Sequence, residues 1–396
     1  MKIDDPLDPT AQAVRAWIDE EGGPLAPSGL PRLLRNEDFL HAMVSVDYLQ
    51  QALNRSSTDN GGPEVSVHIT RSPGMRCAIR LVTPTHAAVM VPAGTLARLQ
   101  VMHRLLLGYW ARGEASPTIL ASIKDRPFER HPPRALLPLI DDLPPPAGAG
   151  PWHGLDALND AIELDAAFAP DVGELNHLAL SLLLSHEFAH VARHHPELLR
   201  RVAAGELAFE VDSGAERRPG TRAELRRAME NDADRVAAYL VVLTLVRQVA
   251  GQPETLPRGF VRLGYAVTAL LALFDPRRLS LMHFGAEASY PHPLVRHDGY
   301  LDDGTTCAEG LGCGDAFSAN ALYGARKCLD ALRLLEYDIY ARRRFCVEDE
   351  HVEPVIHAMR GSTLDMLTLA RERERQNALT LRLNTLISDT YGSFRF

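Results

Sequence analysis

The chain has 396 residues, of which 46% are hydrophobic and 23% are charged, as in globular proteins with an ample core. Asp and Glu together number 51 against 42 for Lys and Arg, so the formal net charge is -9. This acidic balance argues against a nucleic acid or an acidic membrane as the partner, because either would call for a basic face.

The sequence predicts a cytoplasmic protein. Its first residues contain no apolar run of the kind that forms a signal peptide. The 5 cysteines are few and odd in number, which fits reduced thiols in the cytoplasm. Two apolar segments, 236–246 and 263–274, are shorter than the roughly 18–20 residues that a membrane span requires. We therefore expect both to be buried core helices, and no membrane partner.

Two helices are expected at the N-terminus. Asp8 followed by Pro9 is typical of a helix start, because an aspartate caps the first turn and proline needs no backbone donor there. The glycine pair at 22–23 ends that helix. A second helix is expected over 36–54, and the polar run 56–63 after it predicts a loop.

A small antiparallel sheet is expected next. Apolar and β-branched residues dominate 65–69, 77–82 and 87–91, and turn residues separate these runs. Such a sheet can be purely structural, or its edge strand can pair with an extended peptide substrate. A helix over 96–110 and a proline-dense connection complete an N-terminal part that we expect to span 1–150.

A leucine-rich helix carries the most informative motif, His-Glu-Phe-Ala-His at 186–190. His186 and His190 are four residues apart, so their imidazoles project from one face of the helix, one turn apart. Two such imidazoles can bind adjacent positions of a tetrahedral zinc ion, and Glu187 can act as general base towards the attacking water. The motif also arises by chance on helices with hydrogen-bonded histidines. These residues are unusual on an apolar helix, however, unless something pairs with them.

A site with two histidines needs a third protein ligand. The metzincin spacing is excluded, because its glycine position is Arg193 and its third histidine position is Pro196, which also ends the helix. A second helix, which a capping box at 221–224 opens and which continues to about residue 249, offers better candidates. There Glu230 and Asp234 share one face, as suits a ligand and the acid that orients a ligating histidine.

Two alternatives to this assignment remain open. Glu230 and Asp234 can instead form a solvated acidic turn that pairs with Arg226 and Arg227. If a metal is bound but Glu230 is not its ligand, Glu224 and Asp232 on the same helix are the next candidates.

The two motifs together resemble the gluzincin pattern, H-E-x-x-H on one helix and E-x-x-x-D on another. CaaX prenyl-protein endopeptidases, HtpX- and Oma-type membrane proteases and the soluble phage-exclusion Lit-type peptidases share it. The resemblance implies His186, His190 and Glu230 as zinc ligands and Glu187 as the general base.

The resemblance also implies residues around the ligands. Asp234 matches the acid behind them, and His195 matches the histidine that closes the helix motif. The segment 290–296 resembles a downstream His-Pro…Arg element whose cationic or hydrogen-bonding side chain stabilises the oxyanion of the reaction. The spacing is shorter than in the membrane proteases, so His292, Arg296, His297 and Tyr290 are all candidates. Alternatively, the segment is a capped turn with a surface arginine.

We expect a mainly helical α+β protein with a zincin-like core, a small antiparallel sheet and flanking helices. After the N-terminal part, a zinc peptidase core is expected over 151–300 and a helical extension over 301–396, with helices over 316–345 and 354–388. A glycine-rich stretch at 304–314 carries Cys307 and Cys313, whose spacing does not fit a zinc ribbon, and it predicts an ordinary loop.

The expected function is a soluble zinc-dependent endopeptidase that cuts a protein or peptide substrate. The Lit-type peptidases are the most similar, because no membrane helix is predicted. This resemblance implies a latent phage-defence protease with an activating partner. Two alternatives remain: a regulatory protease that cuts a repressor or antitoxin, and a non-catalytic protein with a structural zinc site.

Overall fold

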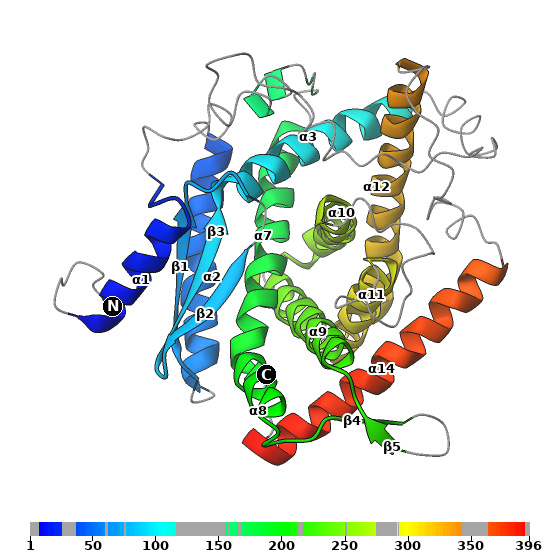
Figure 1. The fold of residues 1–396 in the computed structure, drawn as a ribbon. Helices are drawn as coiled ribbons and strands as arrows, with labels where there is room; N and C mark the ends of the chain where they lie inside the picture. Colours follow the sequence, from blue (N-terminus) through cyan, green and yellow to red (C-terminus); the bar gives the residue numbers. More distant parts are fainter. Residues whose placement is uncertain are drawn as a thin grey trace.

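The computed structural model of the protein describes residues 8–25, 37–59, 62–74, 77–115, 155–156, 159–160, 162, 164, 168–212, 217–249, 252–274, 291, 293–342 and 363–392. Within these residues the fold is mainly helical, with a small three-stranded sheet on one side (Figure 1). This confirms the mainly helical α+β class that the sequence predicts.

The sheet consists of β1 (Glu64–Thr70), β2 (Ala78–Thr83) and β3 (His86–Pro92), in the order β1-β3-β2. All three strands lie where the sequence predicts them, but the sheet is mixed, so the expected antiparallel arrangement is wrong. β2 and β3 form an antiparallel hairpin, whereas β1 pairs with β3 in parallel. β3 is buried along its whole length, and this most apolar strand takes the central position.

The remaining core elements are helices. They are α3 (Ala93–Ala115), α7 (Ala169–Ala192), α9 (Arg222–Gln248), α10 (Leu256–Phe274) with the short 3-10 helix η3 (Pro253–Thr255) before it, α11 (Pro293–Gly310) and α12 (Gly314–Arg342). Figure 1 shows α7 between the sheet and the other helices of this group. One large cluster of buried apolar residues joins all of them except η3. This cluster draws on all three parts that the sequence was expected to contain.

Helices cover both faces of the sheet. On one face α1 (Pro9–Glu20) packs Val14 and Trp17 against Ala88 and Met90 of β3. On the other face α2 (Glu37–Asp59) and α7 pack against the alternate residues of β3, among them Val89. The sheet therefore holds one side of α7 in place.

The two N-terminal helices form as expected, except that the second ends later than the sequence predicts. α1 starts at Pro9 under the Asp8 cap and ends before the glycine pair, as predicted. α2 continues to Asp59 instead of ending near 54, because polar residues near a helix end lower helix propensity only slightly. The buried hydroxyl of Ser57 in its last turn donates to the carbonyl oxygen of Pro63 over 2.6 Å.

The segment Pro253–Leu273, which contains α10 except its last residue, is long and apolar enough to cross a membrane, and in the described residues no other helix is. The expectation that the apolar run at 263–274 is too short for a span is therefore wrong. Most of the segment is buried inside the fold, as expected for a core helix. Gly264 of α10 and Gly324 of α12 let the two helices approach closely. A side chain at either position would overlap a carbonyl oxygen of the opposite helix. α10 is therefore a central packing element.

The glycine-rich stretch at 304–314 is mostly helical, so its prediction as a loop is wrong. α11 continues through Gly310, and only a short turn separates it from α12. Gly304 faces the ring of Phe317 so closely that a methyl group there would lie 2.5 Å from the ring. This glycine serves helix packing and not a turn. Cys307 and Cys313 are free thiols, one buried in α11 and one in the turn.

The C-terminal helix α14 (Thr363–Tyr391) completes the described fold, together with α8 (His195–Ala203) and a short hairpin of β4 (Glu210–Asp212) and β5 (Arg217–Pro219). Leu379, Leu383 and Ile387 of α14 share a buried cluster with Leu198 of α8 and Met229 of α9. α14 runs past the first half of α9 (Figure 1). The helices expected over 316–345 and 354–388 are thus confirmed where the structure describes them.

Candidate metal centre

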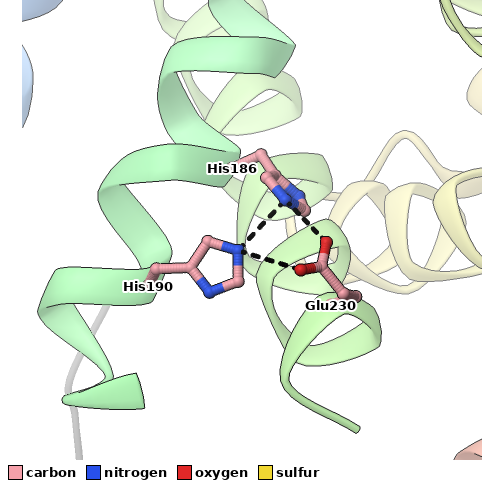
Figure 2. A group of neighbouring side chains, drawn as sticks. All are labelled: His186, His190 and Glu230. Atoms are coloured by element: carbon pink, nitrogen blue, oxygen red, sulfur yellow. Dashed lines mark hydrogen bonds and ion pairs between the residues drawn. The ribbon is translucent and has the colours of Figure 1, made fainter. Parts of the chain in front are cut away.

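Two neighbouring helices, α7 and α9, bring three predicted ligands together. Figure 2 shows His186 and His190 on α7 facing Glu230 on α9. The Nε2 atoms of the two histidines are 3.2 Å apart, and Nε2 of His186 lies 3.2 Å from Oε2 of Glu230. Nε2 of His190 lies 3.8 Å from Oε1 of the same carboxylate. One ligand atom from each residue falls within a group no wider than 4.8 Å, so this group can hold a metal ion.

Local sequence explains why the two helices meet here. Ala189 of α7 and Ala233 of α9 are both fully buried and pack together with Val236, and their small side chains let the helix backbones approach. The start of α9 is fixed by the predicted capping box. Oγ1 of Thr221 accepts a hydrogen bond from the backbone N–H of Glu224, whose carboxylate accepts from the backbone N–H of Thr221. Glu224, an alternative ligand, therefore caps the helix and lies outside the metal group.

Asp234 lies behind His186. Nδ1 of His186 donates to Oδ1 of Asp234 over 2.8 Å, which directs its Nε2 towards Glu230 and His190. Asp234 is buried and also accepts from Arg296, through Nε at 2.6 Å and Nη2 at 2.7 Å, and from Oη of Tyr300 at 2.8 Å. Orientation of a ligating histidine by a carboxylate is typical of zinc sites.

The oxyanion candidates occupy different places. Arg296 lies near the group but directs two of its nitrogen atoms at Asp234. Nε2 of His297 is 2.9 Å from Oγ1 of Thr268. His292 and Tyr290 lie outside the described residues.

Charge within the group shifts its pKa values in opposite directions. Burial alone would lower the pKa of His186, but the hydrogen bonds and negative charges of Asp234 and Glu230 outweigh it and raise this pKa to about 10. Burial and the charge of His186 lower the pKa of His190 to about 3. Burial would raise the pKa of Glu230, yet its ion pair with His186 lowers it to about 2. Glu230 is therefore ionised and His190 neutral at pH 7, as ligands must be.

His190 has its own partners. Its Nδ1 is 2.9 Å from Nδ1 of His195, whose Nε2 is 3.1 Å from Oδ2 of Asp232. The turn that presents His195 contains His194 in the left-handed conformation, with φ of 57°, and α7 ends just before it. Asp232, the other alternative ligand, thus faces His195 and Arg193 and lies outside the metal group.

Sequence reasoning assigned no supporting role to Asp232 and Arg193. Part of this could be read from the sequence, because Glu230, Asp232 and Asp234 are three acids just before the apolar run 236–246. Burial would raise the pKa of Asp232, but its hydrogen bonds and ion pairs with His195 and Arg193 lower it to about 2.

Glu187 is half-buried on α7, next to the first ligand. Burial first, and the negative charge of Glu187 second, raise the pKa of the thiol of Cys77, the residue before β2. The helix that carries Glu187 contacts β2. β2 is an edge strand whose partner among the described residues is β3.

The described residues contain every predicted site residue except His292 and Tyr290. Comparisons with protein-family models, with curated proteins and with solved structures gave no match. The support for a function therefore comes from the chemistry and geometry of the site itself.

Proposed function

We propose that the protein is a zinc-dependent endopeptidase of the gluzincin type, which hydrolyses a peptide bond in a protein substrate. The observation that carries the proposal is the convergence of His186, His190 and Glu230 from α7 and α9. Two imidazoles and one carboxylate are a donor set of catalytic zinc sites. A bound zinc ion would supply a Lewis acid that polarises the substrate carbonyl and lowers the pKa of water.

Donor number favours a catalytic site over a structural one. Structural zinc sites have four protein ligands and are closed, whereas catalytic sites have three and leave a position for water or substrate. In the part of the chain that the structure describes, the group contains three donor residues. This favours hydrolysis over a structural zinc site.

The chain's own residues supply the proton transfer. Glu187 directly follows the ligand His186 on α7 and is half-buried. Its carboxylate accepts a proton from the attacking water and returns it to the leaving nitrogen atom of the peptide. Asp234 holds the His186 ring in position while this happens.

The edge strand β2 supports a peptide as the substrate. β2 lies beside α7, the helix that carries Glu187. Among the described residues no strand pairs with the outer edge of β2. An extended chain that pairs with this edge would run past the metal group, and strand addition of this kind is a common mode of peptide recognition. Leu81 on this strand is 45% exposed and offers an apolar contact.

The resemblance to Lit-type peptidases suggests the biological setting. A latent phage-defence protease would require an activating partner and one dedicated protein substrate. A comparison of new protein N-termini in cells that express the wild type or Glu187→Gln would identify that substrate. The same comparison would identify the substrate if the protein is instead a regulatory protease that cuts a repressor or an antitoxin.

The metal content of purified protein tests the proposal. Plasma mass spectrometry should find about one zinc per chain in the wild type and in Glu187→Gln, and much less in Glu230→Ala. Glu187→Gln should lose cleavage of the identified substrate, because the substitution removes only the proton relay. Absence of zinc from the wild type, even after incubation with the metal, would end the proposal. Full cleavage by Glu187→Gln would be compatible with a bound zinc ion but would rule out Glu187 as the proton relay.

A further inference from the structure

An unbroken series of polar contacts joins the ligand His190 to the C-terminal helix α14. After the contacts of His190 with His195, and of His195 with Asp232, Nε of Arg193 donates to Oδ2 of Asp232 over 2.8 Å. Nη2 of Arg193 donates to Oδ1 of Asn384 on α14. We call His195, Asp232, Arg193 and Asn384 the His190 relay.

The partners in the relay assign the tautomers of both histidines. A carboxylate only accepts hydrogen bonds, so Nε2 of His195 donates its proton to Asp232. A neutral His195 then has its lone pair on Nδ1, which accepts from Nδ1–H of His190. The remaining lone pair of His190 is on Nε2, the atom that faces His186 and Glu230. The relay thereby presents the nitrogen atom that a metal needs.

Burial makes the relay rigid. The side chains of His195 and Asp232 are 2% and 3% exposed, and that of Arg193 is 11% exposed. Water therefore competes little for these hydrogen bonds, and the Arg193 guanidinium offsets the buried charge of Asp232. Each member is held by at least one contact to another helix, since Arg193 ends α7, Asp232 is on α9 and Asn384 is on α14.

The two histidines are thus held by different elements. Asp234 holds His186 directly, with support from Arg296 and Tyr300 on α11. His190 depends on a longer series, whose last member belongs to a helix packed on the outside of α9. A change at Asn384 would reach His190 through Arg193, whereas Asp234 holds His186 without any member of this series.

We propose that Asp232 and Arg193 are positioning residues for His190, and that α14 anchors them through Asn384, so that zinc affinity depends on the docking of α14. This inference rests on the proposed function, because it takes the metal of the group to be zinc. It concerns the affinity of the folded protein for the ion and requires no knowledge of the substrate.

Zinc affinity of the full chain tests the relay. Competition with a chromophoric chelator should show about 10- to 100-fold weaker zinc binding in Asp232→Asn, as for other residues that orient ligating histidines. Asn384→Leu should shift the affinity in the same direction by less, because it acts two contacts further from the metal ligand. The visible absorption spectrum of the cobalt(II)-loaded protein should change in both variants, since the His190 ring would move.

Thr380→Val is the matched control. Thr380 lies one turn from Asn384 on α14 and accepts a hydrogen bond from Asn231 of α9 over 2.8 Å. Its hydroxyl donates to the carbonyl oxygen of Gln376, so its side-chain hydrogen bonds involve no member of the relay. The control should lower the melting temperature about as much as Asn384→Leu and leave the zinc affinity and the cobalt spectrum unchanged.

Three results would overturn the inference. Wild-type zinc affinity and cobalt spectra in both relay variants would show that His190 needs no relay, and the proposed function would be untouched. Equal weakening in Thr380→Val would show a general loosening of α14. Absence of zinc binding in the wild type would contradict both the role of the relay and the proposed function. If Asp232→Asn fails to fold by circular dichroism, Asn384→Leu decides the question.

Discussion

Three acids within five residues of α9 face three different partners. Glu230 faces His186 and His190, Asp232 faces His195 and Arg193, and Asp234 faces His186. A buried carboxylate is costly unless a cation or several donors compensate it, and each of these has such a partner. In the proposed site, Glu230 would bind the metal ion, while Asp234 orients His186 and Asp232 orients His190 through His195.

The shifted pKa of His186 makes zinc binding depend on pH. Without a metal ion its pKa is about 10, so the ring is protonated at pH 7 and must lose that proton before Nε2 can bind zinc. A raised pKa favours the proton, so zinc affinity should weaken as the pH falls, by up to about tenfold per unit below pH 10. Calorimetric titration with zinc at pH 7, in two buffers of different protonation enthalpy, should show release of about one proton. Equal heats in both buffers would contradict this.

Truncation of Arg296 should lower the stability of the fold, and not only the rate of cleavage. Its guanidinium donates twice to the buried Asp234, and truncation to alanine would leave that charge under-compensated. Removing one partner of a buried ion pair costs about 3–5 kcal/mol, so urea unfolding of Arg296→Ala should show a loss of this order. Arg296→Lys should recover only part, because an ammonium group cannot make two parallel hydrogen bonds. Wild-type stability and zinc content combined with lost cleavage would instead favour the oxyanion role.

At the scale of elements, the sequence predicts what local spacing determines. The i, i+4 histidines of α7 and the capping box of α9 involve residues at most four apart, so they are readable without the fold. The parallel pairing of β1 with β3 is not local, because it depends on which strand is buried at the centre of the sheet. Strand positions were therefore predicted and their order was not.

The His190 relay and the glycine-rich segment show the same limit. Arg193 and Asn384 are separated by 191 positions along the chain, and no spacing rule connects them. Gly304 belongs to a helix because it packs on Phe317, so tertiary packing outweighs its weak helix propensity. Elements whose conformation depends on a distant partner are those that sequence patterns misassign.

At the scale of the whole molecule, the metal group lies where the two halves of the fold meet. α7 packs on the sheet through Leu184 and Phe188 and on the helical group through Leu178 and Leu182. α9 in turn contacts α11 and α14. An ion bound between α7 and α9 would thus join the sheet side of the molecule to its C-terminal helices.

Zinc should therefore stabilise the whole fold. A ligand that binds only the native state adds about 2.7 kcal/mol at a free concentration of 100 Kd, so added zinc should raise the melting temperature of the chelator-treated wild type. Glu230→Ala is the control, because it removes one donor from the group while both histidines stay, and its melting temperature should respond little to zinc. Differential scanning calorimetry with and without zinc would measure both. A wild type that melts at the same temperature in zinc and in chelator would mean that the ion does not bind between α7 and α9. An equal rise in Glu230→Ala would move the stabilising site elsewhere in the molecule.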